Sequence, residues 1–194
     1  MTALPRPTLE GQRVRLVPLS MDHLPGLVTV GLSPDLWTWI PSPVTNAQEM
    51  EAFVRVALDG HERGEMIPFA TTLRSDGRVV GSTRFGNIAL DHRRLEIGWT
   101  WIAPEFQRTP VNTEAKLLMM AYAFEELGCQ RVELKTDALN ARSRAAILRI
   151  GAKEEGTFRK HMITSSGRVR DTVYFSITDE EWPEVKERLR AKLA

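Results

Sequence analysis

The sequence is short of the features that mark several classes of protein. Its 194 residues contain a single cysteine, Cys129, so the chain cannot form an internal disulfide, and we expect a reducing compartment. No apolar run is long enough to span a bilayer, and the first residues contain no apolar segment typical of a secretory signal. We therefore expect a cytoplasmic protein without a membrane partner.

Motifs for metals, nucleotides and nucleic acids are also missing. The four histidines have no ligand spacing, and one cysteine cannot complete a zinc site with them, so we expect no metal. No Walker loop, dinucleotide fingerprint or Gly-x-Ser-x-Gly elbow occurs. The net charge of +1 and the lack of a long basic run argue against a nucleic-acid partner.

Positive charge is nevertheless concentrated in one part of the chain. Between Arg131 and Arg170 there are ten Lys and Arg residues against four Asp and Glu residues, an excess of six. A local basic surface on a nearly neutral protein would suit a small polyanion. The alternative is a solvated surface with no ligand.

The patterns that are present indicate one α/β domain over residues 1–194. A chain of this length with 42% hydrophobic residues can bury its own core. Alternating apolar runs predict strands, and apolar residues three and four apart predict helices. The expected strands are 13–17, 66–73, 79–88, 94–102, 131–136, 158–164 and 170–177, and the expected helices are 22–30, 47–63, 112–128, 140–150 and one from 179 onward. A mixed, mostly antiparallel sheet of about seven strands flanked by helices results.

The most informative stretch joins the strand 94–102 to the next helix. Pro104 ends the strand because proline cannot donate to a sheet ladder. The loop that follows runs into a helix N-terminus, where unpaired N–H groups and the helix dipole together form an anion site. We expect this helix to begin near Asn112, with Asn112 as its N-cap.

Strand, Gln/Arg loop and helix in this order resemble the cofactor-binding motif of the GNAT superfamily of N-acetyltransferases. The following Thr113-Glu114-Ala115 is similar to the RimJ/RimL-type branch. The resemblance implies that acetyl-CoA (coenzyme A) is the co-substrate and that the loop cradles its pyrophosphate. The implied cofactor-binding residues in this stretch are Trp101, Ile102, Gln107, Arg108, Thr109, Pro110, Val111, Asn112 and Thr113.

The loop departs from the family pattern Gln/Arg-x-x-Gly-x-Gly/Ala. Pro110 and Asn112 fill the two small positions, and Pro110 has no N–H to offer a phosphate. Arg108 would replace that donor with a full positive charge, and its contact with a phosphate can be bidentate. The alternative is that Arg108 points to solvent and pairs with Glu105.

Acyl transfer to an amine requires a base for the ammonium proton and an acid for the leaving thiolate. The run Leu95-Glu96-Ile97-Gly98-Trp99 matches the family strand whose glutamate often serves as the base, so the resemblance implies that Glu96 is catalytic. Alternation places Glu96 beside Gly98 and Thr100, on the face opposite Leu95, Ile97, Trp99 and Trp101. The alternative for Glu96 is a surface carboxylate paired with Arg93 or Arg94.

A second motif, Asn140-Ala141-Arg142-Ser143, follows the strand 131–136 and matches the family pattern Asn-x-x-Ser/Ala. The resemblance implies that Asn140 binds the pantetheine arm and that Ser143 lies near the sulfur. Many relatives use a tyrosine further along this helix as the acid, but Ile147 occupies that position, so Ser143 becomes the candidate acid. Asn140 also fits as the N-cap of its helix, and Ser143 also fits as an exposed helical serine.

The proline-rich stretch 33–43 resembles the loop that lines the acceptor side of the family's cleft. The resemblance implies substrate contacts for Trp37 and Trp39, while simple packing under a loop is the alternative. The predicted function is direct transfer of an acetyl group to a primary amine, on a protein N-terminus or a small molecule, in a ternary complex. A binding or regulatory protein without turnover, an enzyme for a larger acyl group, and a homodimer all remain open.

Overall fold

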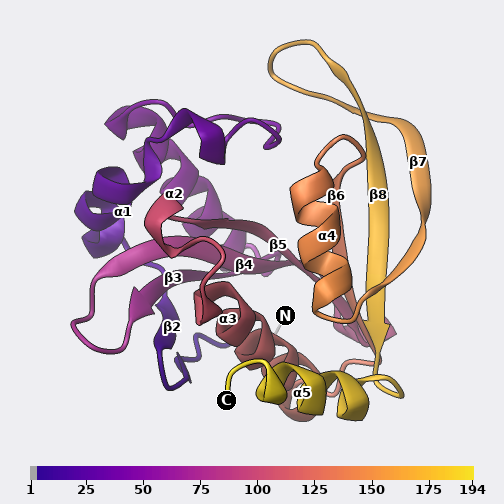
Figure 1. Cartoon of the computed structure of the whole chain (residues 1–194). Coiled ribbons are helices and arrows are strands. Elements are labelled where there is room, and N and C mark those ends of the chain that lie inside the picture. Colours follow the sequence, from indigo (N-terminus) through magenta and orange to yellow (C-terminus); the bar gives the residue numbers. More distant parts are fainter. Residues whose placement is uncertain (1–3) are drawn as a thin grey trace.

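The computed structural model describes residues 4–194, which form one eight-stranded sheet flanked by helices (Figure 1). The strands are β1 Leu9–Glu10, β2 Val14–Pro18, β3 Ile67–Leu73, β4 Val79–Ala89, β5 Arg94–Ile102, β6 Arg131–Asp137, β7 Lys153–Ile163 and β8 Val169–Thr178. The α-helices are α1 Leu24–Gly31, α2 Ala47–Glu62, α3 Pro110–Ala121, α4 Ala141–Arg149 and α5 Trp182–Ala191. The predicted mixed α/β architecture is confirmed.

The strand order is β1-β2-β3-β4-β5-β6-β8-β7. Neighbouring strands are antiparallel except for β5 and β6, which are parallel. The eighth strand is β1, whose two residues pair with β2 and were not expected. The strand 13–17, which alternates like an edge strand, therefore lies between β1 and β3 rather than at the edge.

The two faces of the sheet are covered by different helices. Phe69 and Ala70 are neighbours on β3, yet they belong to two separate apolar cores, as the two-residue period of a strand requires. The core around Phe69 includes α3 and α5 and extends to Ile147 on α4. The core around Ala70 includes α1 and α2. We call these the α3 face and the α2 face of the sheet.

The parallel strands β5 and β6 separate soon after they meet. Their pairing covers only Arg94 to Glu96 of β5 and Arg131 to Glu133 of β6. Beyond Glu96 the two strands diverge, so β3–β5 lie across the view in Figure 1 whereas β6–β8 stand close to vertical. Backbone groups along the diverging edges are left for a ligand or water to satisfy.

A β-bulge at Trp99 changes the predicted facing of the second half of β5. Ser82 pairs with Trp101 but Arg84 pairs with Gly98, so β5 carries one extra residue there, and Trp99 has a left-handed φ of 50°. The Trp99 ring and Trp101 therefore lie on the α2 face with Glu96. Thr100 lies on the α3 face, where its Oγ1 accepts a hydrogen bond from Lys116. The predicted placement of Trp99 and Trp101 opposite Glu96, and of Thr100 beside it, is wrong.

The start of α3 also differs from the prediction. The helix begins at Pro110 and its N-cap is Thr109, whose Oγ1 accepts from the N–H of Val111 at 3.4 Å. Asn112 is the third helical residue and not the cap. Proline is favoured at the first helical position because its fixed φ suits the helix and its missing N–H would have no intrahelical partner.

Candidate active site

Glu96 is the buried carboxylate at the point where β5 and β6 separate. Its side chain is 3% exposed, and its Oε2 accepts a hydrogen bond from Asn87 at 2.5 Å and lies 2.8 Å from Nζ of Lys135. No described residue hydrogen-bonds to its Oε1, which extends over Gly98. The alternative pairing with Arg93 or Arg94 does not occur, because Arg94 contacts Glu133 instead.

More charged side chains continue from Glu96 along the α2 face. Asp137 at the end of β6 is buried and contacts Arg168, and its Oδ2 lies 3.8 Å from Nε of Arg170. Burial lowers the pKa of Arg170, although the carboxylates of Asp137 and Glu96 oppose that change. Nζ of Lys135 lies 5.7 Å above the Tyr174 ring, which extends the polar surface toward β8.

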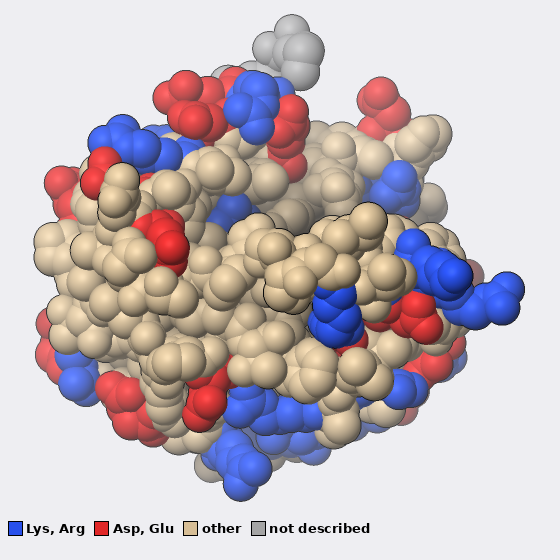
Figure 2. Space-filling view, turned by 90° about the horizontal axis from the view of Figure 1, so that it is seen from above, with Lys and Arg blue, Asp and Glu red and all other residues tan. Residues whose placement is uncertain are grey.

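A hollow of about 570 Å³ opens on this face beside Asn87. It is lined by Asn87, which hydrogen-bonds Glu96, and by Tyr174, Phe158 and several charged residues of β5, β6 and β7. Seen from above, the molecule is hollowed between the side carrying α1 and α2 and the side carrying the β7–β8 hairpin (Figure 2). The hollow reaches Asn87, the partner of Glu96, but Glu96 itself is not among the residues that line it.

The hairpin and the α1–α2 connection meet above the sheet. The N–H of Ser165 in the turn between β7 and β8 donates to the carbonyl of Pro41 at 3.0 Å. The guanidinium of Arg168 lies 5.7 Å above the ring of Trp39, which is half-buried. Trp39 therefore lies beside the charged cluster, where it can contact an acceptor.

Trp37 occupies a different environment. It is 3% exposed, packs against Phe53 and Trp101, and donates from Nε1 to the carbonyl of Gly31 at 2.7 Å. These contacts fit the packing alternative for Trp37. Trp101 is equally buried in the same core, and its Nε1 has no partner among the described residues.

The loop before α3 is held by side chains rather than by glycines. Gln107 donates from Nε2 to the carbonyl of Ile102 at 3.0 Å, and Thr109 donates from Oγ1 to the carbonyl of Phe106 at 2.7 Å. Arg108 is exposed with a left-handed φ of 61°, and no ion pair with Glu105 forms. The guanidinium of Arg108 is therefore available to an anion at the helix N-terminus.

The N-terminus of α4 lies next to this loop. Nη1 of Arg142 donates to Oε1 of Gln107 at 3.0 Å, which joins the loop before α3 to the first turn of α4. Asn140 is the N-cap of α4, because its Oδ1 accepts from the N–H of Ser143 at 3.0 Å. Ser143 is half-buried and no contact joins it to Glu96. Two helix N-termini thus open toward the gap between β5 and β6.

The sequence patterns missed four polar residues that shape this region. Lys135 and Asn87 hold Glu96, but they reach it only through strand pairing that local patterns do not reveal. Glu114 is buried and accepts from the N–H groups of Gln12, Arg13 and Val14, and so fixes the β1–β2 turn to α3. Lys116 is buried beside Thr100. The one signal in the sequence was that Glu114 and Lys116 are charged residues in a helix that is otherwise mostly apolar.

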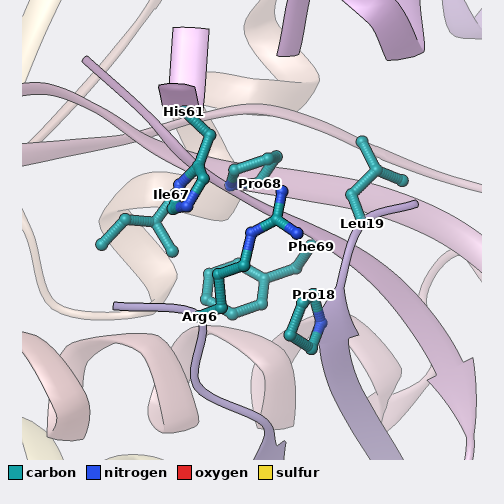
Figure 3. Close-up of a pocket in the computed structure, with 7 residues that line it drawn as sticks. All are labelled: Arg6, Pro18, Leu19, His61, Ile67, Pro68 and Phe69. Carbon is teal, nitrogen blue, oxygen red and sulfur yellow. The ribbon is translucent and has the colours of Figure 1, made fainter. Parts of the chain in front are cut away.

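A separate crevice lies away from these residues (Figure 3). It is lined by Arg6, Pro18, Leu19, His61, Ile67, Pro68 and Phe69, and the Arg6 side chain extends into it. None of the predicted site residues lies there. Within residues 4–194 no three His, Cys, Asp or Glu side chains are placed to hold a metal ion. None of the helices described is long and apolar enough to cross a membrane.

Similarity to known proteins agrees with this geometry. Residues 13–153 match the family model for the acetyltransferase (GNAT) domain. The putative ribosomal N-acetyltransferase YdaF of Bacillus subtilis is 38% identical over 107 residues, which cover 55% of this chain and 57% of YdaF. The chain is thus matched to less than two thirds of that relative's length.

Solved structures extend the similarity to the whole chain. A GCN5-related N-acetyltransferase from Brucella melitensis is 34% identical, with a TM-score of 0.91 and coverage of 100% of this chain and 88% of that one. Mycobacterium smegmatis RimJ, solved in complex with CoA-disulfide, is 25% identical, with a TM-score of 0.83 over 96% and 95% of the two chains. The chain belongs to the RimJ/RimL-type branch of the GNAT family of N-acetyltransferases, which use acetyl-CoA as acetyl donor.

Proposed function

We propose that this chain transfers the acetyl group of acetyl-CoA directly to a primary amine, with Glu96 as the general base. The observation that carries the proposal is the arrangement of the Glu96 carboxylate. It is buried at the point where β5 and β6 separate, and both of its described partners contact Oε2. Oε1 is thereby left to accept a proton from an incoming ammonium group, directly or through one water.

The residues at the two helix N-termini fit an acetyl-CoA co-substrate. Arg108 and the first turn of α3 offer positive charge and N–H groups to the pyrophosphate. Pro110 removes one donor from this set, because the N–H at the first helical position would otherwise be unpaired and free for a phosphate. Oδ1 of Asn112 is buried without a partner among the described residues, which leaves a polar group in the first turn for the cofactor to satisfy.

The reaction then needs three proton movements. Glu96 takes a proton from the ammonium group, the neutral nitrogen attacks the thioester carbonyl carbon, and a tetrahedral intermediate forms. As the C–S bond breaks, the nitrogen loses its second proton and the leaving thiolate gains one. We assign both of these transfers to the hydroxyl of Ser143 in the first turn of α4, which gives its proton to sulfur and is reprotonated by the proton that the nitrogen releases. The products are the N-acetylated amine and free CoA.

We propose a protein N-terminus as the first acceptor to test. The name of YdaF, putative ribosomal N-acetyltransferase, supports this choice. A small-molecule amine is the second candidate, because the relative named FsC-acetyl coenzyme A-N(2)-transacetylase, from Aspergillus fumigatus, is 27% identical over 94% of this chain. The open hollow beside Asn87, which hydrogen-bonds Glu96, would admit the end of a peptide or a small molecule.

The decisive variant is Glu96→Gln, which keeps the shape of the side chain and removes the base. We expect turnover to fall by about 10²–10⁴, the usual contribution of a general base, with acetyl-CoA affinity unchanged. The loss should be largest at low pH, where most of the amine is protonated. Glu65→Gln is the matched control, since Glu65 is also ion-paired but is exposed and lies near the end of α2. Full activity in Glu96→Gln would mean that another base or bulk water takes the proton.

Binding of the donor is tested separately from turnover. We expect acetyl-CoA to raise the melting temperature, because a ligand that binds only the native state stabilises it by mass action. Succinyl-CoA and free CoA in the same experiment test for a larger acyl group. No stabilisation by any of the three at millimolar concentration would favour a binding or regulatory protein without turnover.

A further inference from the structure

Arg84 is a buried cation at the centre of β4 that has no acidic partner among residues 4–194. It is 1% exposed, and its Nε and Nη2 lack any hydrogen-bond partner. Its Nη1 lies 3.6 Å from the thioether sulfur of Met66, which is a weak acceptor. Its guanidinium carbon lies 4.4 Å above the Phe53 ring and 5.4 Å above the Trp99 ring.

Burying the Arg84 guanidinium without an anion lowers the stability of the fold unless another group compensates for the charge. An unpaired charge in a protein interior loses its hydration without gaining an opposite charge. Burial lowers the pKa of Arg84 to about 10, so the guanidinium still carries its charge at neutral pH. Arg170, which is nearly as buried, lies 3.8 Å from the carboxylate of Asp137. The surroundings of Arg84 lack the corresponding anion.

The two unpartnered nitrogens of Arg84 are the pair that suits a carboxylate. Nε–H and the neighbouring N–H of Nη2 point the same way from one edge of the planar guanidinium. A carboxylate accepts from these two donors through its two oxygens, and this fork also selects planar anions with two adjacent oxygens.

Arg84 is also placed within reach of the proposed base. Arg84 pairs with Gly98 and Glu96 pairs with Gly86, so the two charged residues are diagonal neighbours on the α2 face of β4 and β5. Diagonal neighbours on paired strands are typically about 7–8 Å apart. The other diagonal consists of two glycines, which add no side chain between them. A molecule with an amine and a carboxylate a few bonds apart has the length to span from Glu96 to Arg84.

Trp99 is the side chain that separates the two groups. Its ring lies over Gly86 and beside the guanidinium of Arg84. A left-handed φ is unusual for a bulky residue and persists only where the surroundings hold it. Trp99 is half-buried whereas Arg84 is almost fully buried, so a ligand that contacts Arg84 from the side of Trp99 would have to displace the Trp99 ring.

We propose that the Nε–Nη2 edge of Arg84 binds a carboxylate of the acceptor, and that the acceptor is a primary amine carrying this carboxylate a few bonds from its nitrogen. Free amino acids and peptides with an acidic N-terminal residue belong to this class. The proposal rests on the proposed function, because it takes Glu96 as the position of the reacting amine. The carboxylate would supply the missing counter-charge and orient the nitrogen toward the thioester.

The test compares matched pairs of amines with the wild-type protein and Arg84→Met. L-Alanine with L-alaninamide, and Asp-Ala with Asn-Ala, differ in the carboxylate near the amine. Because the amine of an amide is intrinsically less basic, the quantity compared is the acid-to-amide ratio of kcat/KM in each protein, from the release of free CoA thiol. We expect this ratio to fall by about 10- to 100-fold in Arg84→Met, the size of a lost charge-assisted contact.

Two further variants separate binding from folding. Arg84→Lys keeps the charge without the fork and should give an intermediate ratio. Arg55→Met removes an exposed arginine of α2, which pairs with Glu51, and should leave the ratio unchanged. Arg84→Met should not be less stable than the wild type, because replacing an unpaired buried charge by an apolar side chain removes a desolvation cost.

The proposed function and the carboxylate site fail in different ways. If no amine is acetylated, the site is tested by the melting temperature of the CoA-bound protein. A rise with L-alanine but not with L-alaninamide, which Arg84→Met does not show, still supports the site. An equal response to acid and amide in the wild type would overturn it. So would an Arg84→Met protein that keeps the preference or loses both substrates equally, since Arg84 would then serve the fold or bind only water.

Discussion

The pKa of Lys116 is lowered strongly by burial, and this makes the stability of the fold depend on pH. It lies in the second turn of α3 and is 6% exposed, and its Nζ donates to Oγ1 of Thr100 at 2.7 Å. Thr100 Oγ1 in turn lies 2.7 Å from Oγ1 of Thr83. Burial lowers the pKa of Lys116 from 10.5 to about 7.

The sign of the effect follows from which state holds the proton. Between pH 7 and 10.5 the unfolded chain keeps the proton on Lys116 while the folded chain releases it, so stability rises with pH across this window. Below pH 7 both states are protonated and the full cost of the buried charge remains. At 1.36 kcal/mol per pKa unit, the change from 10.5 to about 7 corresponds to about 5 kcal/mol.

Lys116→Met keeps the length of the side chain and removes the charge. The Met variant also loses the hydrogen bond to Thr100, worth about 1 kcal/mol. We therefore expect the variant to be more stable than the wild type by up to about 4 kcal/mol at pH 6, with the difference shrinking steadily toward pH 9.5. Lys192→Met, which removes an exposed lysine, should show no such change with pH.

Equilibrium urea unfolding of the three proteins at pH 6, 7.5, 8.5 and 9.5 measures these differences. The midpoint and the slope are both needed, because a changed slope would report a changed denatured state. Stability curves of wild type and Lys116→Met that stay parallel from pH 6 to 9.5 would refute the reasoning. Lys116 would then keep an ordinary pKa in the folded protein, through water that reaches its ammonium group.

Two other side chains give further predictions. Arg108→Ala should weaken acetyl-CoA binding by about 1.5–3 kcal/mol and reduce its salt dependence, as measured by calorimetric titration at two salt concentrations. Arg159→Ala on β7 is the exposed control, and equal affinities and salt slopes for Arg108→Ala and wild type would show that Arg108 does not touch the cofactor. Glu114→Gln should lower the free energy of unfolding by about 2–4 kcal/mol, because its carboxylate accepts from three backbone N–H groups. A loss below about 0.5 kcal/mol in urea unfolding would mean that the β1–β2 turn does not depend on that charge.

Much of the fold follows from local pattern. The strand Arg94–Ile102 was predicted with the bounds that the structure shows, because its apolar alternation is strong and Pro104 ends it. The predicted helix from 47 to 63 also agrees closely with α2, whose N-cap Asn46 accepts from the N–H of Glu49 at 2.9 Å. Each of these signals lies within a few residues of the element that it defines.

The orientation of side chains after Gly98 was not predictable in the same way. Alternation assumes that each residue turns to the opposite face, and one extra residue at Trp99 reverses every side chain that follows. Neither Trp99 nor Thr100 is a residue type that favours a left-handed conformation. The bulge depends on what the rest of the fold provides, including Gly86 on β4, which leaves room for the Trp99 ring.

Contacts distant in sequence account for the rest. The carboxylate of Glu114 bonds to residues about a hundred positions earlier, and Lys135 reaches Glu96 from the next strand. The N-cap of α3 was misassigned for a different reason. Thr109 and Asn112 are both good caps, and Pro110, read as a lost phosphate donor, in fact marks the first helical residue.

Two buried cations that lack an acidic partner among the described residues lie on either side of the bulge. Arg84 lies beside Trp99 on the α2 face, and Lys116 donates to Thr100 on the α3 face. The two cations therefore approach the bulge in β5 from opposite faces of the sheet. Both are almost fully buried, and burial lowers the pKa of each. The two cations differ in charge at neutral pH, because Arg84 keeps its proton whereas Lys116, with a pKa of about 7, is only partly protonated. Both lie next to the segment where β5 has left β6. Below pH 7 both are therefore charged, and in a low-dielectric interior their positive potential on that gap is weakly screened.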